Sequence, residues 1–147
     1  MDLKSLLAAG PLGLDTALFI YLIEEHAEVL PQVDRSFSAV AAGDCRAATS
    51  ALTLLEVLVL PYRAGNLGLV ERYEQVLGGS RGLELVGLDR PVLHLAARLR
   101  AESRLRTPDA IQMAAALHVG CSVFVTNDRD LPSVRGLRVV QLRHLVG

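Results

Sequence analysis

Short apolar segments with the composition of buried strands alternate along this chain with longer helical segments. The strand-like segments are residues 10–15, 45–51, 82–88, 121–128 and 137–142. The helical segments are residues 16–25, 31–43, 53–65, 67–79, 89–105 and 108–120, and Asp89 is expected to be the N-cap of the fifth. This alternation predicts an α/β fold, with a mostly parallel sheet and helices on both of its faces. Such sheets place functional sites beyond the carboxyl ends of their strands.

The 147 residues contain no linker or repeat, and their number suits one domain with a full hydrophobic core. No apolar run approaches the ~18 residues of a membrane span, and no signal peptide is expected. The two cysteines, Cys45 and Cys121, lack metal-ligand spacing, which favours buried thiols in a cytoplasmic protein without membrane contact. Hydrophobic residues make up 51% of the chain, and this surplus suggests a protein partner.

The net charge of −1 argues against a general polyanion binder, but the charges are unevenly distributed. Five basic and ten acidic side chains precede Ser80, and ten basic and six acidic ones follow from there. All ten of those basic residues are arginines, whose planar fork suits phosphate. The alternative interpretation is a solvated helix face.

Each of five acids has an ordinary structural explanation when it is taken alone. Asp15 follows a strand and can cap the next helix. Glu56 comes three residues after Thr53, which is the spacing of a capping box. Asp109 lies in a first helical turn, where the helix dipole favours it, after Thr107 as N-cap and Pro108 as first helical residue. The last two, which follow a strand and are typical of a turn or a short cap, are Asp128 and Asp130.

Taken together, the acids can converge on one edge of the sheet. Asp15 and Asp128 leave carboxyl ends of strands, Asp109 begins the helix that feeds the second of these strands, and Glu56 lies in a first helical turn. Gathered carboxylates repel one another unless a cation compensates. Their hard oxygen ligands suit Mg²⁺ or Mn²⁺, and no His and Cys set indicates zinc.

Four segments in order, "GLDTALFIYLIEE", "TSALTLLEVL", "TPDAIQMAAAL" and "VFVTNDRDL", resemble the PIN domain family, in particular the VapC-type ribonuclease toxins. The resemblance runs from about Leu14 to Leu142. It implies a three-layer fold with a five-stranded parallel sheet and helices on both faces. On this basis residues 1–147 form a single PIN-like domain, with residues 1–11 as an N-terminal extension.

The resemblance also implies an activity, a cofactor and a site. Such proteins cleave RNA with Mg²⁺ or Mn²⁺, and we expect in-line attack by metal-activated water that leaves 5′-phosphate and 3′-hydroxyl ends. The acids that carry the metal and the catalysis would be Asp15, Glu56, Asp109 and Asp128. The accessory residues would be Asp130, Thr126, Asn127 and Thr16. The protein would then be the toxin of a type II toxin–antitoxin pair.

An acidic site repels RNA, so nearby cations must attract the substrate. Arg106 precedes Asp109 by three residues and Arg129 adjoins Asp128, and we expect both arginines to contact phosphate. Arg98 and Arg104 have an equally good alternative, which is pairing with local glutamates such as Glu102.

The helical segment "LTLLEVLVLPY" is apolar almost all round, and it is expected to kink or end near Pro61. One interpretation buries it within the monomer. The other makes it a surface for a second copy or an antitoxin, and the resemblance favours a homodimer and a cognate antitoxin.

Two other functions fit parts of the sequence. A non-catalytic PIN-like module that binds RNA or protein is the main alternative, and the intact acids count against it. A phosphoryl-accepting receiver needs a lysine near its aspartate, and the only lysine here is Lys4, at the wrong end of the fold.

Overall fold

The computed structural model describes residues 2–25 and 30–145. Its strands form one five-stranded sheet, parallel throughout, in the order β3-β2-β1-β4-β5. The strands are β1 (Leu12–Leu14), β2 (Ala47–Ser50), β3 (Leu83–Val86), β4 (Val123–Thr126) and β5 (Arg138–Gln141). Each lies inside a segment predicted as a strand, and the predicted α/β fold is confirmed.

The strand order places a topological switch point between β1 and β4. From β1 the chain builds outward through β2 to β3, and it then returns to add β4 and β5 on the other side. Leu14 pairs with Val125, so the residues that follow them, Asp15 and Thr126, come out side by side at the carboxyl edge. Open α/β sheets bind ligands at such a switch point.

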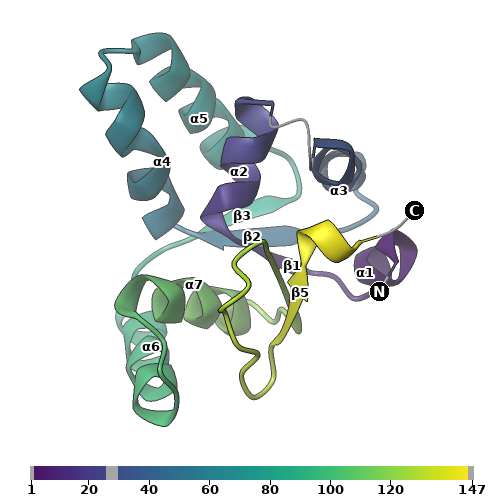
Figure 1. Ribbon diagram of the computed structural model, residues 1–147, viewed down its shortest axis with the longest axis vertical. Helices are drawn as coiled ribbons and strands as arrows, with labels where there is room; N and C mark the ends of the chain where they lie inside the picture. The colour runs from purple at the N-terminus through teal and green to yellow at the C-terminus, as the bar shows by residue number, and fades with distance from the viewer. Residues whose placement is uncertain (1, 26–29, 146–147) are drawn as a thin grey trace.

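Helices cover both faces of the sheet (Figure 1). One face carries α1 (Leu3–Ala8), α2 (Thr16–Ile23), α3 (Leu30–Ala42), α5 (Leu67–Gly79) and the short 3-10 helix η1 (Leu142–His144). The other face carries α6 (Arg90–Glu102) and α7 (Thr107–His118). The helix α4 (Leu52–Arg63) packs beside α2 and α5. The sequence did not predict α1 or η1.

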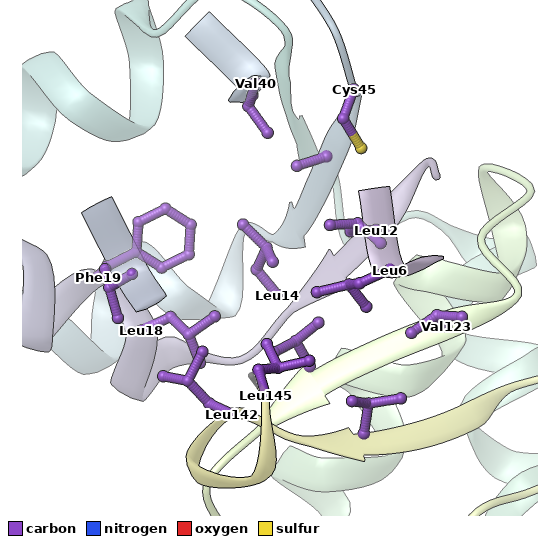
Figure 2. Close-up of a cluster of buried hydrophobic side chains, with 14 of the residues drawn as sticks. Leu6, Leu12, Leu14, Leu18, Phe19, Val40, Cys45, Val123, Leu142 and Leu145 are labelled. Carbon is purple, nitrogen blue, oxygen red and sulfur yellow. The ribbon is translucent and has the colours of Figure 1, made fainter. Parts of the chain in front are cut away.

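The core is divided by the sheet into two clusters. Figure 2 shows the cluster beneath α1, α2 and α3. Phe37 packs against this cluster, and its ring meets that of Phe19 edge to face at a centroid distance of 5.2 Å. On the other face the small residues of α7 allow a very close approach to β1. A Cβ atom added to Gly13 would lie only 2.7 Å from the Cβ of Ala116. Glycine at this position therefore allows the end of α7 to pack directly on β1.

Helix starts agree with the sequence in two cases and differ in two. Asp15 and Asp89 cap α2 and α6 as predicted, each accepting a backbone N–H. Thr107 is not an N-cap, because Arg106 holds that position and α7 has no side-chain cap. Its hydroxyl instead accepts from Arg100. Likewise, α4 starts without a side-chain cap after Ala51, so the predicted capping box of Thr53 and Glu56 does not form.

The α4 helix exposes one apolar face instead of being buried all round. Leu60 is 70% exposed, Leu55 62% and Tyr62 58%, while Val57 and Pro61 are buried. The helix runs through Pro61 and ends at Arg63. The interpretation that buried this segment within the monomer is therefore wrong.

Both cysteines are buried free thiols, as predicted. Within residues 2–25 and 30–145 no helix has the length and apolar character needed to cross a membrane.

Candidate functional site

Asp15 is held at the carboxyl edge of the sheet by bonds to both of its oxygens. Its Oδ1 accepts the N–H of Thr16 at 2.8 Å, as expected where a strand passes into a helix. Its Oδ2 accepts the hydroxyl of Thr126 from the end of β4. The half-buried carboxylate is therefore fixed between the two strands of the switch point.

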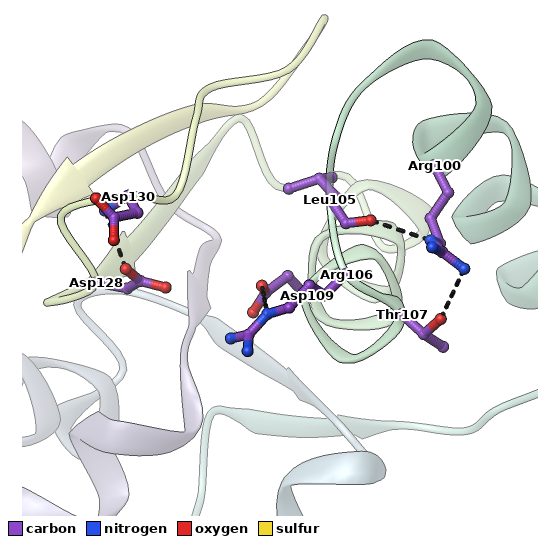
Figure 3. Close-up of polar contacts among 7 residues, drawn as sticks. All are labelled: Arg100, Leu105, Arg106, Thr107, Asp109, Asp128 and Asp130. Atoms are coloured by element: carbon purple, nitrogen blue, oxygen red, sulfur yellow. Dashed lines mark hydrogen bonds and ion pairs between the residues drawn. The ribbon is translucent and has the colours of Figure 1, made fainter.

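Asp109 reaches the same edge from the first turn of α7. Its side chain is 27% exposed, and its Oδ2 lies 3.6 Å from Nε of Arg106. Arg100 shapes this corner, because its guanidinium donates to the carbonyl of Leu105 at 3.0 Å and to Thr107 Oγ1 at 2.9 Å (Figure 3).

Asp128 is positioned by the loop that follows β4. Its N–H donates to Thr126 Oγ1 at 3.0 Å, and its Oδ1 accepts the N–H of Asp130 at the same distance. Gln141 of β5 donates to its backbone carbonyl at 2.8 Å. Thr126 thus links two of the predicted acids, since it donates to Asp15 and accepts from Asp128. The side chain of Asp130 itself is exposed.

Asn127, in the same loop, is held by three hydrogen bonds from Arg143. Its Oδ1 accepts from the backbone N–H of Arg143 at 3.0 Å and from the guanidinium at 3.3 Å, and its carbonyl accepts a third bond at 2.7 Å. Asn127 therefore anchors the loop to η1.

Glu56 comes from α4 and belongs to a network that the sequence did not reveal. Its Oε1 accepts from the hydroxyl of Thr16 at 2.8 Å and from Nε2 of Gln112 at 3.2 Å. Gln112 is 4% exposed and also donates to Thr53. One sequence feature could have indicated this role of Gln112. It is a single amide in an otherwise apolar helix, and it lies three residues after Asp109 and hence on the same helix face.

The charges of neighbouring acids act on both Asp15 and Asp109. Burial raises the pKa of Asp15, and the charges of Asp109 and Glu56 raise it further against the two hydrogen bonds. Burial also raises the pKa of Asp109; the guanidinium of Arg106 opposes this shift, while the charges of Asp128 and Glu56 add to it. The structure thus brings together the four acids that the sequence singled out.

Two hollows flank this edge. A cavity of about 360 Å³ is lined by three acids, two arginines and an apolar floor, namely Asp109, Asp128, Asp130, Arg104, Arg106, Leu105, Leu131 and Pro132. A more apolar groove of about 400 Å³ runs between α2, α4 and α5, and Glu56 lies on its rim with Leu60, Pro61 and Tyr73. Asp15 lines neither hollow.

The chemistry of the donors fits a hard divalent cation, although the acids are not gathered into a ligand shell. In the described ranges no group of three or more His, Cys, Asp or Glu side chains is arranged so that it could hold a metal ion. Burial raises the pKa of Asp15 and of Asp109, and repulsion from the other acids adds to both shifts; a cation relieves that repulsion. Carboxylate oxygens are also the ligands that Mg²⁺ and Mn²⁺ prefer.

The arginines near the site are largely free to meet a ligand. The side chain of Arg106 is 81% exposed, and Arg129 is exposed in the loop after β4. Among the described residues neither Arg98 nor Arg104 forms an ion pair with Glu102.

A model of the PIN domain family matches residues 13–137, which is most of the chain. Among curated proteins no sequence matches at a significant level.

Three solved structures share the fold. VapBC2 from Rickettsia felis, bound to a DNA fragment from their promoter, has a TM-score of 0.68 at 16% identity, over 88% of this chain and 97% of that chain. A toxin–antitoxin complex from Klebsiella pneumoniae has a TM-score of 0.65 at 22% identity, over 87% and 95%. DNA-bound VapBC from Salmonella typhimurium has a TM-score of 0.64 at 25% identity, over 89% and 97%.

The family match covers all four predicted acids, and it agrees with the resemblance read from the sequence. The chain belongs to the PIN domain family.

Proposed function

We propose that this protein is a divalent-metal-dependent endoribonuclease and the toxin of a type II toxin–antitoxin pair. The observation that carries the proposal is the convergence of Asp15, Glu56, Asp109 and Asp128 at the switch point of the sheet. Their charges act on one another there, and this costs stability. Acids whose pKa is raised by burial and by neighbouring charges, as for Asp15 and Asp109, are typical of functional sites.

Each acid has a separate part in the proposed chemistry. Asp15, Asp109 and Asp128 would hold Mg²⁺ or Mn²⁺, and Glu56 would position the attacking water. The bound ion would supply a lowered pKa for that water and neutralise charge on the phosphate. Thr126 serves by orienting Asp15 and Asp128 at the same time. Asp130 and Thr16 support their neighbours through the N–H of Asp130 and the hydroxyl of Thr16.

The substrate backbone would approach along the cavity beside α7. Arg104 and Arg106 line that cavity together with Asp109 and Asp128, so a phosphate can lie between cations and the bound ion. Arg129 would add a further cation from the loop after β4. Phosphate contacts of this kind position a strand without reading its sequence.

The toxin assignment rests on the likeness to VapBC complexes and on the surface of α4. The apolar face of that helix adjoins the groove on whose rim Glu56 lies. An antitoxin bound there would both cover exposed apolar surface and block the site, and a second copy of the chain could bury the rest. We propose the cytoplasm as the place of action.

A ribonuclease assay tests the proposal. A 5′-labelled single-stranded RNA is incubated with the protein in Mg²⁺, in Mn²⁺ and in EDTA, beside Glu56→Gln and Asp128→Asn. We expect cleavage with either ion and products with 5′-phosphate and 3′-hydroxyl ends. We expect no cleavage in EDTA, and a strongly lowered but measurable kcat for the two variants.

The alternative is a PIN-like module that binds RNA or protein without cleaving. The open spacing of the acids favours it, because they do not form a ligand shell as they stand. RNA that is bound but uncleaved under every condition of the assay would support this alternative.

A further inference from the structure

Gln112 joins three elements of the fold through one buried amide. It projects from α7, and its Nε2 lies 2.9 Å from Thr53 Oγ1 of α4, 3.1 Å from Thr16 Oγ1 of α2 and 3.2 Å from Oε1 of Glu56. Its Oε1 lies 3.4 Å from the N–H of Ser50 at the end of β2. A backbone N–H can only donate, so this contact sets the amide with its NH₂ group toward Glu56.

The direction of most bonds in the network follows from its two ends. Thr16 Oγ1 and Thr53 Oγ1 also lie 3.1 Å apart, but the hydrogen of each hydroxyl goes to another acceptor. The carbonyl of Leu14 can only accept, and it takes the hydroxyl of Thr49 at 2.9 Å. Thr49 must then accept from Thr53 at 2.7 Å, which leaves Thr53 to accept from Gln112. This arm of the network, from Gln112 through Thr53 and Thr49 to Leu14, does not include any of the four acids.

The other arm ends on the carboxylate. Ionised Glu56 can only accept, so Thr16 donates to it and accepts in turn from Gln112. Oε1 of Glu56 therefore accepts the hydroxyl of Thr16, and it shares the second hydrogen of the Gln112 amide with Thr16 Oγ1. In the described part of the chain no hydrogen bond engages its second oxygen, which stays available.

We propose that Gln112 is a positioning residue for Glu56. It holds one carboxylate oxygen against the protein, so that the other is presented to the water or ion of the site. The inference rests on the proposed nuclease function and deepens it. Residues that orient a ligand or a base in this way typically contribute about 10-fold to 100-fold to activity or metal affinity.

The test compares Gln112→Met, which keeps the volume but removes both donors, with Thr49→Val as the matched control. Thr49 is equally buried and belongs to the arm that ends on Leu14. We expect Gln112→Met to lower kcat for RNA cleavage by about 10-fold or more with an unchanged KM, and to reduce the Mn²⁺-dependent rise in Tm. Thr49→Val should lower Tm without changing kcat.

A double-mutant cycle separates positioning from mere structural support. In the Glu56→Gln background, Gln112→Met should cause no further loss of kcat, because the group that it positions has already been disabled. An equal loss in both backgrounds would overturn the inference, and so would a natural kcat in the single variant.

A second pair of variants covers the case in which Gln112→Met does not fold. Thr16→Val removes the other donor to Glu56 and should lower kcat, whereas Thr16→Ser keeps the hydroxyl and should restore it. Equal kcat values for these two variants would overturn the inference. A natural protein that neither cleaves RNA nor gains Tm with Mn²⁺ would instead overturn the proposed function, and the inference with it.

Discussion

Nε of Arg106 lies 3.6 Å from Oδ2 of Asp109, one turn apart at the start of α7, while 81% of the arginine side chain stays exposed. Exposed ion pairs of this kind contribute little to stability, typically less than about 1 kcal/mol. The guanidinium can therefore exchange its partner at small cost. It can leave Asp109 for a phosphate when a cation takes over the carboxylate.

Arg106→Gln should weaken the binding of single-stranded RNA and lower its salt dependence. One lost phosphate contact reduces the slope of log affinity against log salt by about 0.7. Fluorescence anisotropy with labelled RNA in EDTA, over a KCl series, measures this slope. Arg138→Gln, at the start of β5 and hence at the far edge of the sheet, is the control that should leave it unchanged. Equal slopes for Arg106→Gln and the natural protein would remove Arg106 from the interface.

Asp15→Asn should change how stability depends on pH in the absence of metal. Because the folded-state pKa of Asp15 is raised above 3.8, its protonated form favours folding; that contribution is complete below pH 3.8 and is lost as pH rises through the raised pKa. Asparagine cannot ionise and remains a good N-cap. The variant should therefore gain free energy of unfolding relative to the natural protein as pH rises from about 4 to about 7. Urea denaturation in EDTA measures the difference, and a difference that does not change with pH would contradict the assignment.

Arg100→Met should destabilise the corner between α6 and α7. Two hydrogen bonds to Leu105 and Thr107 are lost, and we expect a cost of about 1 kcal/mol in the free energy of unfolding. Arg98→Met changes an exposed arginine of the same helix and should cost much less. Urea denaturation gives both values, and hydrogen exchange should rise in residues 103–109 of the Arg100 variant alone. Equal costs would show that the two bonds contribute nothing.

Leu60→Lys should reduce self-association without loss of stability. Leu60 is 70% exposed on the apolar face of α4, so a lysine there remains solvated. Leu88→Lys, at a residue that is 40% exposed outside that face, serves as control. Sedimentation velocity should find the natural protein and the control dimeric, and the Leu60 variant monomeric. Unchanged dimerisation of that variant would exclude this face as the homodimer surface.

The strands and the acidic edge could be predicted because both depend on local sequence. Each strand is a short apolar segment between helices, and parallel connections oblige the carboxyl ends to meet at one edge. Asp15 and Asp89 cap helices as their positions indicated. The buried state of Cys45 and Cys121 followed from their spacing and surroundings.

The features that escaped prediction depend on contacts distant in the sequence. Gln112 donates a hydrogen bond to Thr16, which lies 96 positions away in the sequence, and no local pattern around either residue predicts this bond. Glu56 has capping-box spacing from Thr53. Because α4 packs against α7, both side chains instead accept hydrogen bonds from Gln112. Thr107 is not the N-cap because α7 begins one residue earlier, with Arg106 at the N-cap position, and the Thr107 hydroxyl accepts from Arg100 instead. The exposed face of α4 depends on which helices pack beside it, and the hydrophobic periodicity of the segment does not predict those neighbours.

The most direct test of the proposed metal site is thermal unfolding with and without Mn²⁺, for the natural protein and for Asp109→Asn. Binding at about 100 times Kd contributes about 2.7 kcal/mol, so the Tm of the natural protein should rise by roughly 5–10 °C. The variant should lose most of that rise, and without metal it should be more stable than the natural protein, because one half-buried repelling charge is gone. An unchanged Tm of the natural protein in Mn²⁺, or an equal rise in both proteins, would contradict a metal site at Asp109.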